Sequence, residues 1–311
     1  MVPIDIGSLE GKSPTEVAEL TLNSGALNDT NQIETVFQFL ENGDAFQNVD
    51  EFLTAVTNSS ELPAISIAVR DIVMNLTFNI ISTHFPTFDT ADWEAWFKVK
   101  LVLVLPSFTA EMLTTTISNI GCTNYQVVVE GIGSVFGNMD SEKTLEIAKI
   151  LVSHLTEFLS QFKSPACQNN IKDDSDWLKV NLGPFADKVD YSELKELNIT
   201  GLAVLGSLSP EQKVNLLLDS TTGALENVSV VTEVFSSILQ SPEQMDKFFE
   251  YFVQIGSLEG KSPTEVAELT LNSGALNDTN QIETVFQFLE NGDAFQNVDE
   301  FLTAVTNSSE R

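Results

Sequence analysis

The sequence has few basic residues: 15 Lys and Arg stand against 45 Asp and Glu in 311 residues, which gives a formal net charge of −30. Proteins bind DNA, RNA and anionic membranes through basic surfaces, so this balance argues against all three partners. Long hydrophobic runs are also missing, because the longest candidate, Ile65–Ile81, is interrupted by Arg70 and Asp71. A bilayer-spanning helix needs about 20 apolar residues, and Met1–Gly7 lacks the basic start and the apolar core of a signal peptide. We therefore expect no membrane insertion.

Residues that carry catalysis are scarce as well. His84 and His154 are the two histidines. His84 is predicted to lie in a loop before Phe85-Pro86, and His154 lies on an apolar helix, where we expect a structural role. No Gly-x-Ser-x-Gly elbow, phosphate-binding glycine loop or zinc-type Cys/His cluster is present. The densest acidic cluster, Asp173–Asp176, lacks the spacing of a calcium loop and is interpreted as helix capping on a solvated surface. The sequence therefore predicts no enzyme, no cofactor and no metal site.

The most informative feature that is present is a long perfect repeat. Residues 6–61 recur without a change as residues 255–310, at an offset of 249 residues. Either the chain is one full period of a long tandem array plus the start of the next, or its ends were duplicated artificially. Under both explanations, the two identical segments are expected to fold alike locally.

A weaker repeat lies inside this long period. Ser209-Pro210 recurs as Ser262-Pro263 at a spacing of 53 residues, and Val234-Phe235 recurs as Val285-Phe286 at a spacing of 51 residues. Each unit of about fifty residues is predicted to hold three short helices, slightly longer than armadillo and HEAT repeats. Such a unit can bury its apolar face only by stacking on its neighbours, which produces a superhelix.

These repeats predict an all-α fold, a right-handed α-solenoid of armadillo-like two- and three-helix repeats with about fourteen helices. Helix starts support it: Ser13-Pro14-Thr15-Glu16 has a Ser N-cap, Pro at the first helical position and Glu at the third. Ser209 and Ser241 begin the same pattern. The short apolar run Val99–Leu105 fits a buried strand, but a mostly buried helix is favoured. The predicted segments are a first repeat copy (1–61), a less regular middle region (62–206), a degenerate repeat (207–255) and the second copy (256–311).

Cysteines and glycosylation signals bear on the compartment. Cys122 and Cys167 are the two cysteines. They are either two buried free thiols or a disulfide closing a loop of ~45 residues, worth roughly 3–4 kcal/mol, and we adopt the disulfide. Asn-x-Ser/Thr sequons favour a secreted, N-glycosylated protein, and they start at Asn28, Asn58, Asn75, Asn198, Asn227, Asn277 and Asn307. Asn75 falls in the middle of a predicted helix, where a glycan is least expected.

Phenylalanine dominates the aromatic residues, with 21 Phe against three Trp and three Tyr, which is typical of core filling. Eight phenylalanines occupy equivalent positions in the two perfect copies and are predicted to form the stacking face between units: Phe37, Phe39, Phe46, Phe52, Phe286, Phe288, Phe295 and Phe301. A terminal unit that leaves this face uncovered exposes an apolar patch, and such a patch is an association site.

Part of the chain resembles a known family. The segment Asp176–Phe185 (DWLKVNLGPF), followed by Leu194, by Leu197-Asn198 and by Gly206–Gln212 (GSLSPEQ), looks like the mesothelin, stereocilin and otoancorin group. The resemblance covers about Cys122 to Gln254. It implies an extracellular or cell-surface glycoprotein built as a superhelical stack of armadillo-like repeats, with a role in adhesion, matrix or gel assembly and no enzymatic activity. The perfect long repeat departs from the family pattern.

The main functional hypothesis is a structural or adhesive extracellular glycoprotein, a segment of a tandem array that assembles head to tail into a fibre, matrix or mucus-like material. Its predicted partners are other copies of itself, through burial of apolar helix faces worth about 25 cal/mol per Å². The acidic surface and the N-linked glycans are expected to keep the sides of the array soluble. The alternative is a concave solenoid binding module whose acidic surface attracts a basic protein or peptide partner.

Overall fold

The computed structural model describes residues 4–59, 64–168, 171–219, 224, 227–258, 260–273, 276, 282, 285–286, 288–290 and 293–308 of the chain. The structure is 78% helical, with no strand in these ranges. The predicted all-α fold is therefore confirmed. The helices outnumber the about fourteen expected from the 3.6-residue periodicity, because short helices and helical turns separate several of the longer ones. The handedness of the superhelix stays a prediction.

The chain divides into two compact units, Met1–Ile199 and Thr200–Arg311. The helices of the first unit are α1 (Ile6–Leu9), α2 (Pro14–Ser24), η1 (Ala26–Asn28), α3 (Thr30–Leu40), α4 (Ala45–Thr57), α5 (Ile67–Ile81), η2 (Ser82–Thr87), α6 (Thr90–Ala95), η3 (Trp96–Lys100), η4 (Leu105–Ser107), α7 (Ala110–Ile117), α8 (Cys122–Ser134), η5 (Phe136–Asn138), α9 (Ser141–Glu157), α10 (Leu159–Phe162), α11 (Asp174–Asn181), η6 (Gly183–Lys188) and α12 (Tyr191–Glu196). Those described in the second unit are η7 (Gly201–Ser207), α13 (Pro210–Leu218), α14 (Val228–Leu239), η9 (Pro242–Gln244), α15 (Met245–Leu258), α16 (Pro263–Ser273) and α18 (Ala294–Ser308).

Local capping chemistry starts many of these helices. Ser13 and Ser209 each form the predicted capping box, in which the side chain of the third helical residue returns a hydrogen bond to the cap backbone. Ser241 behaves differently: it begins the short 3-10 helix η9 and makes no side-chain cap hydrogen bond. The stretch Val99–Leu105 is not a strand. Its first residues belong to the π-helical segment η3, which continues α6, and helical turns follow.

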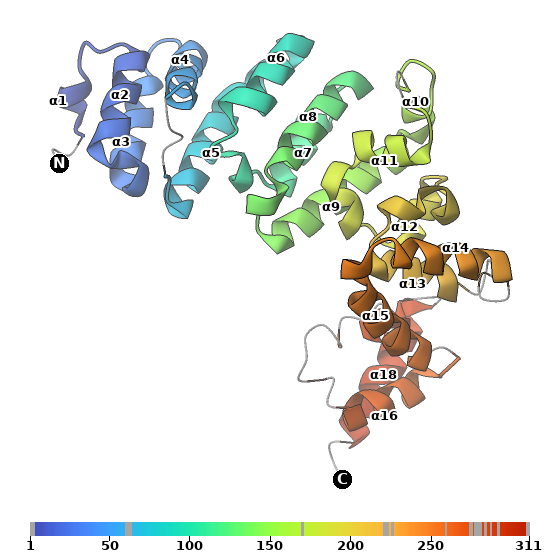
Figure 1. Ribbon diagram of the computed structural model, residues 1–311. Helices are drawn as coiled ribbons and strands as arrows, with labels where there is room; N and C mark the ends of the chain where they lie inside the picture. Colours follow the sequence, from blue (N-terminus) through green and yellow to red (C-terminus); the bar gives the residue numbers. More distant parts are fainter. Residues whose placement is uncertain are drawn as a thin grey trace. The chain divides into compact units, whose positions relative to one another are not determined.

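In the first unit, helices pack mainly against neighbours that lie two to four elements away in the chain (Figure 1). These pairs are α2 with α4, α3 with α5, α4 with η3, α6 with α8, α7 with α9 and α8 with α11. One of these layers is unusually close, because a β-carbon on Gly131 of α8 would lie 2.6 Å from the carbonyl oxygen of Phe97 in η3. Packing between chain neighbours is the pattern of a helical solenoid, and it gives each helix layer two apolar sides.

The three-helix repeat predicted from the weaker sequence repeat is visible as a recurring pair of aromatic rings. Phe37 packs edge-on against Phe52 with ring centroids 6.0 Å apart. The equivalent distances are 5.6 Å for Phe235 and Phe248 and 5.7 Å for Phe286 and Phe301. In the same three repeats, the first and third helices pack together: α2 with α4, α13 with α15, and α16 with α18. The repeat is thus a three-helix unit whose second and third helices share one edge-to-face contact.

Candidate stacking interface

The eight phenylalanines predicted to stack between units have two different environments. The pairs Phe37–Phe52 and Phe286–Phe301 contact each other inside their own copy. Phe39 and Phe288 are half-buried. Phe46 differs from these, because its ring meets aromatic residues that follow the first copy in the chain. The ring that reaches beyond the repeat is therefore the one at the start of α4.

The surface through which the first copy meets the following helices is called the end face here, and it consists of Leu27 in η1 and of Phe46 and Leu53 in α4. Leu27 and Leu53 are 5% and 2% exposed. The backbone N–H of Ser66 donates a hydrogen bond of 3.0 Å to the carbonyl oxygen of Leu27. Since α4 packs against α5 and η3, and η1 against α5, these later helices cover the end face.

The surface that covers the end face is called the acceptor surface, and it is built by His84, Phe88, Trp96, Lys100 and the backbone of Ser66. The Phe46 ring stacks on His84 at a centroid distance of 4.1 Å and lies 5.6 Å from Trp96. Lys100 makes an ion pair with Asp50 of α4 and places its ammonium 4.8 Å from the centre of the Trp96 ring. The acceptor surface therefore combines aromatic faces with the ammonium of Lys100, which the Trp96 ring and the Asp50 carboxylate hold in place.

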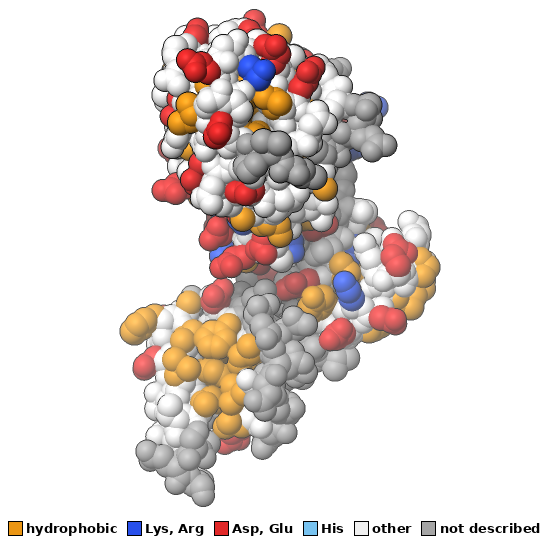
Figure 2. Space-filling model, turned by 90° about the vertical axis from the view of Figure 1, so that its left-hand side faces the viewer, with side chains coloured by type: hydrophobic (Ala, Val, Ile, Leu, Met, Phe, Trp, Pro, Cys, Tyr) orange, Lys and Arg blue, Asp and Glu red, His pale blue; other side chains and the backbone are white. Residues whose placement is uncertain are grey.

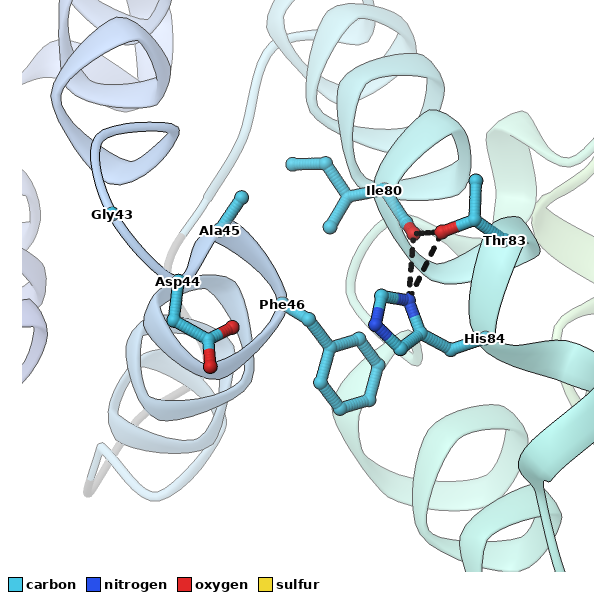
Figure 3. A pocket seen from close by; sticks show the side chains of 7 residues that line it. All are labelled: Gly43, Asp44, Ala45, Phe46, Ile80, Thr83 and His84. Carbon is cyan, nitrogen blue, oxygen red and sulfur yellow. Dashed lines mark hydrogen bonds between the residues drawn. The ribbon is translucent and has the colours of Figure 1, made fainter.

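A pocket of about 510 Å³ opens beside this contact and is lined by Gly43, Asp44, Ala45, Phe46, Ile80, Thr83 and His84. Figure 3 shows the rings of Phe46 and His84 facing each other from α4 and η2. The imidazole Nδ1 of His84 lies 3.0 Å from the Thr83 hydroxyl and 3.3 Å from the Ile80 carbonyl oxygen. These contacts hold the imidazole flat against the phenyl ring. The predicted loop position of His84 was wrong, because His84 lies in the 3-10 helix η2.

The second copy keeps its own core but not the cover of its end face. Leu258, Val266, Ala267, Val285, Leu289 and Phe301 form a buried cluster. The residues equivalent to Leu27, Phe46 and Leu53 are exposed, at 45% for Leu276, 86% for Phe295 and 47% for Leu302. Figure 2 shows hydrophobic side chains gathered in the lower part of the view, at the height of α15, α16 and α18 in Figure 1. Thus Leu27 and Leu53 are buried and Phe46 is half-buried in the first copy, whereas all three equivalents are exposed in the second.

The carboxylate next to the end face, Asp50 in the first copy and Asp299 in the second, also differs in exposure between the copies. Asp50 in the first copy is half-buried beside Lys100. Its equivalent in the second copy, Asp299, is exposed. Four residues of this contact were not predicted, because none of them belongs to a recognisable motif: Asp50, Lys100, Leu27 and Leu53. No sequence pattern connects them: Leu27 lies inside the first copy, Asp50 and Leu53 lie near its C-terminal end, and Lys100 lies in the middle region.

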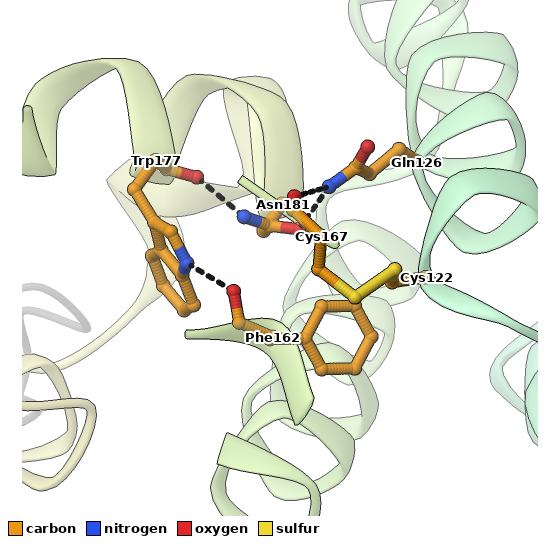
Figure 4. The surroundings of a disulfide bond; sticks show 6 residues. All are labelled: Cys122, Gln126, Phe162, Cys167, Trp177 and Asn181. Carbon is orange, nitrogen blue, oxygen red and sulfur yellow. Dashed lines mark hydrogen bonds between the residues drawn. A yellow bond between two sulfur atoms is a disulfide. The ribbon is translucent and has the colours of Figure 1, made fainter. Parts of the chain in front are cut away.

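The structure joins Cys122 of α8 to Cys167 as a disulfide with a Cα–Cα distance of 5.8 Å (Figure 4). Buried hydrogen bonds surround it. Asn181 donates from its side-chain nitrogen to the Trp177 carbonyl oxygen at 2.9 Å, and its side-chain oxygen accepts from Gln126 at 3.1 Å. The indole N–H of Trp177 donates to the Phe162 carbonyl oxygen at 3.1 Å. The disulfide therefore links α8 to the segment before α11 at a place that is also fixed by polar contacts.

Six of the seven predicted glycosylation sites fall on described residues, and all six asparagines are exposed: Asn28, Asn58, Asn75, Asn198, Asn227 and Asn307. Asn277 lies outside the described residues. Asn198 has a left-handed backbone, with φ of 54°. Asn75 lies inside α5, as expected, and the Thr77 hydroxyl of its sequon is buried without a hydrogen-bond partner among the described residues. Access of a glycan to the asparagine is therefore possible at all six, although Asn75 is set in a helix whose neighbouring residues are packed.

The remaining polar candidates have local structural roles. Asp173 caps α11 by accepting a hydrogen bond from the Asp176 backbone at 2.9 Å, which agrees with the interpretation of the acidic cluster. The His154 ring stacks on Tyr125 at a centroid distance of 5.3 Å, and burial lowers its pKa because the charged imidazole loses hydration. Burial likewise lowers the pKa of Lys213 in α13, whose ammonium donates to the Gln244 side chain at 3.3 Å. In the described part of the chain, no group of three or more His, Cys, Asp or Glu side chains is placed to hold a metal ion.

Two further findings bear on the class of protein. Among the described helices, none is both long enough and apolar enough to cross a bilayer. No family model, no curated protein and no solved structure matches this chain. The arrangement of the end face and the acceptor surface is therefore the observation from which a function has to be argued.

Proposed function

We propose that this chain is a structural protein, a segment of a tandem array of helical repeats that assembles head to tail. The observation that carries the proposal is the contrast between the two identical copies. The end face of the first copy is buried by the helices that follow it, whereas the same face of the second copy leaves Phe295 86% exposed. An aromatic side chain exposed to this extent beside two half-exposed leucines is an association surface.

The driving force of this assembly is burial of apolar area, at about 25 cal/mol per Å². Stacking on the end face is directional, because the face lies on one edge of the repeat and meets a different surface on its partner. A contact of this kind is heterologous: it does not close on itself and can continue as a linear array. The net charge of −30 opposes lateral clumping of the arrays, since like-charged sides repel each other.

The proposed setting is extracellular, with N-linked glycans at exposed sequons and a role in a fibre, a matrix, a gel or cell adhesion. The disulfide between Cys122 and Cys167 supports it, because disulfides persist in oxidising compartments. The exposed asparagines of the sequons support it as well. The resemblance to the mesothelin, stereocilin and otoancorin group and the right-handed superhelix belong to the same proposal.

The test is the assembly state of the full chain at rising concentration, measured by analytical ultracentrifugation and electron microscopy. We expect unbranched linear particles at high concentration, and we expect the double variant Phe295→Ser/Leu302→Ser to suppress them. The matched control is Val228→Ser/Leu239→Ser, which removes two other exposed apolar side chains of the second unit and is expected to leave assembly unchanged. A chain that stays monomeric up to its solubility limit contradicts the proposal.

The alternative of a concave binding module for a protein or peptide partner stays a prediction. The test above also addresses it: a binding module stays monomeric at every concentration, and its end-face variants lose affinity for the partner instead of losing self-assembly.

A further inference from the structure

The two copies make it possible to say which surface the exposed end face fits. Residues 255–310 have the same sequence as residues 6–61, and they hold the same internal ring pair, at 5.7 Å against 6.0 Å. A segment with the same residues and the same internal ring pair can make the same outer contacts. The acceptor surface, which receives the first copy, is therefore a matching partner for the second copy.

Each contact of the first copy with the acceptor surface has a counterpart in the second copy. Phe295 would take the place of Phe46 on His84, and the carbonyl of Leu276 would take the place of the Leu27 carbonyl that accepts from Ser66. Asp299 would replace Asp50 as the partner of Lys100. With 15 basic against 45 acidic residues, a lysine is a scarce partner for a carboxylate in this protein. The match is therefore one of charge as well as of shape.

In each molecule, however, the acceptor surface is already occupied by that molecule's own first copy. We infer that the first copy is an exchangeable plug: in a second molecule, residues 255–308 can displace residues 6–59 from the acceptor surface and bind there in the same way. This inference rests on the proposed head-to-tail assembly and names its partner surface, a second copy of this chain. Each chain then offers one donor and one acceptor, so exchange produces open chains of molecules.

Competition between the two identical segments is decided by concentration. The plug is tethered to α5 by a short connection, and a short tether corresponds to an effective concentration on the order of millimolar. At about 1 µM, binding of the second copy of another molecule is therefore disfavoured by roughly a thousandfold relative to binding of the tethered first copy, although the contacts are the same. The wild-type chain is expected to be monomeric at micromolar concentration and to exchange only as it approaches millimolar. The plug is in this sense an autoinhibitory segment.

The ion pair provides two variants with the same composition and the same net charge. In Lys100→Glu/Asp299→Lys, the charges attract between molecules and repel within a molecule. In Lys100→Glu/Asp50→Lys, they attract within a molecule and repel between molecules. Both variants lose the cation over the Trp96 ring. A difference in their assembly therefore reports only whether the acceptor surface binds the first copy of the same molecule or the second copy of another molecule.

We expect the first variant to assemble at a concentration at least tenfold lower than the second, by analytical ultracentrifugation at low salt, and the difference to shrink as salt screens the charges. Equal assembly of the two variants, with far-ultraviolet circular dichroism showing both folded, overturns the inference. If the wild-type chain still forms linear particles in that case, the proposed function stands without exchange. If Lys100→Glu/Asp299→Lys assembles but the wild-type chain never does, exchange stands and the proposed function is wrong.

A second pair of variants tests the aromatic contact without changing any charge. Phe46→Ala weakens the plug alone and is expected to lower the concentration of half-assembly at least tenfold relative to the wild type. Phe295→Ala weakens the donor alone and is expected to abolish assembly. Phe46→Ala/Phe295→Ala weakens both equally and is expected to return the chain to the monomer at the concentrations where Phe46→Ala assembles. An association of Phe46→Ala that survives the second substitution overturns the inference, because it would not use the end face of the second copy.

Discussion

The two perfect copies share every residue but not every environment. Several residues inside each copy are equally buried: Val17, Ala18 and Leu40 in the first copy, and Val266, Ala267 and Leu289 in the second. Others differ, since Ile33, Val49 and Val56 are buried whereas Ile282, Val298 and Val305 are only partly buried. At the edge of the copy the difference is largest, because Leu53 is 2% exposed and Leu302 is 47% exposed. The difference separates two kinds of burial. One is specified within about fifty residues, and the other depends on what is stacked next to the repeat.

The two identical copies also make controlled mutagenesis possible within one chain. A substitution at one position of this chain has a natural control, which is the same substitution 249 residues away in the same local sequence. Helix propensity and capping are then equal in the two variants, so any difference in stability reports on tertiary contacts alone. The following predictions use such pairs.

The largest effect is expected at the shared core. Phe52 and Phe301 are 2% and 1% exposed and each packs edge-on against a second ring. Phe52→Ala and Phe301→Ala are each expected to lower the free energy of unfolding by about 3–5 kcal/mol, measured by urea unfolding followed by circular dichroism. The two losses should agree. A much smaller loss for Phe301→Ala would mean that the copies do not share one core.

The second effect is expected to differ between the copies. Leu53→Ala removes a buried side chain at the end face and is expected to cost about 2–5 kcal/mol. Leu302→Ala removes the equivalent half-exposed side chain and is expected to change stability by less than about 0.5 kcal/mol in the monomer. The same urea titrations, run at low micromolar concentration, compare the two. Equal losses would contradict the covered and uncovered states of the two end faces.

A smaller and again equal effect is expected at the helix starts. Ser13 and Ser262 each accept a hydrogen bond from the backbone of the third helical residue, at 3.3 Å and 3.4 Å, and replacement of either by Ala is expected to cost about 1 kcal/mol. Hydrogen bonds from the same serines lower the pKa of Glu16 and Glu265. A carboxylate whose pKa is lowered by folding stabilises the fold above its unfolded pKa, and this contribution is lost as the pH falls through its folded pKa.

The pH dependence provides the check for the capping prediction. The wild-type chain and the two serine variants should be compared at neutral pH and in acid below the ordinary glutamate range. The difference between wild type and each variant should shrink in acid, by the same extent at both copies. A pH-independent difference would show that the hydrogen bond from the serine hydroxyl to the glutamate carboxylate does not contribute to stability.

The smallest effect is expected at the ion pair. Asp50→Asn breaks the contact with Lys100 and is expected to cost about 1 kcal/mol or less, since both side chains keep contact with water. Asp299→Asn is expected to leave the stability of the monomer unchanged. A double-mutant cycle with Lys100→Met measures the coupling, which should be present for Asp50 and absent for Asp299 at micromolar concentration. Coupling of Lys100 to Asp299 under these conditions would mean that exchange has already taken place.

Much of the fold could be predicted from the sequence, because it depends on short-range chemistry. Ser13 and Ser209 start helices as expected, since the cap needs only residues up to three positions away. The prediction at Ser241 was less accurate: its Ser-Pro-Glu-Gln pattern is that of a capping box, yet the segment forms a 3-10 helix without the cap bond.

The candidate site could be predicted only in part. Phe46 and Phe295 were among the predicted stacking residues, but the same periodicity also selected Phe37 and Phe52, which face each other inside the copy. Helical spacing shows that residues share a face, not which neighbour covers that face. The ion pair between Asp50 and Lys100 joins residues fifty positions apart, and no pattern in the sequence connects them.

The sequence by itself determined the repeat, the three-helix unit and the ends of many helices, because hydrogen bonds at a cap and apolar contacts one helical turn apart act between chain neighbours. Only the tertiary structure decided that Phe46 is covered and Phe295 is open, and that Lys100 meets the first copy. Identical sequences cannot encode different surroundings. The difference comes from the helices that pack on each copy. The burial of a residue therefore depends on those neighbouring helices as much as on the residue itself.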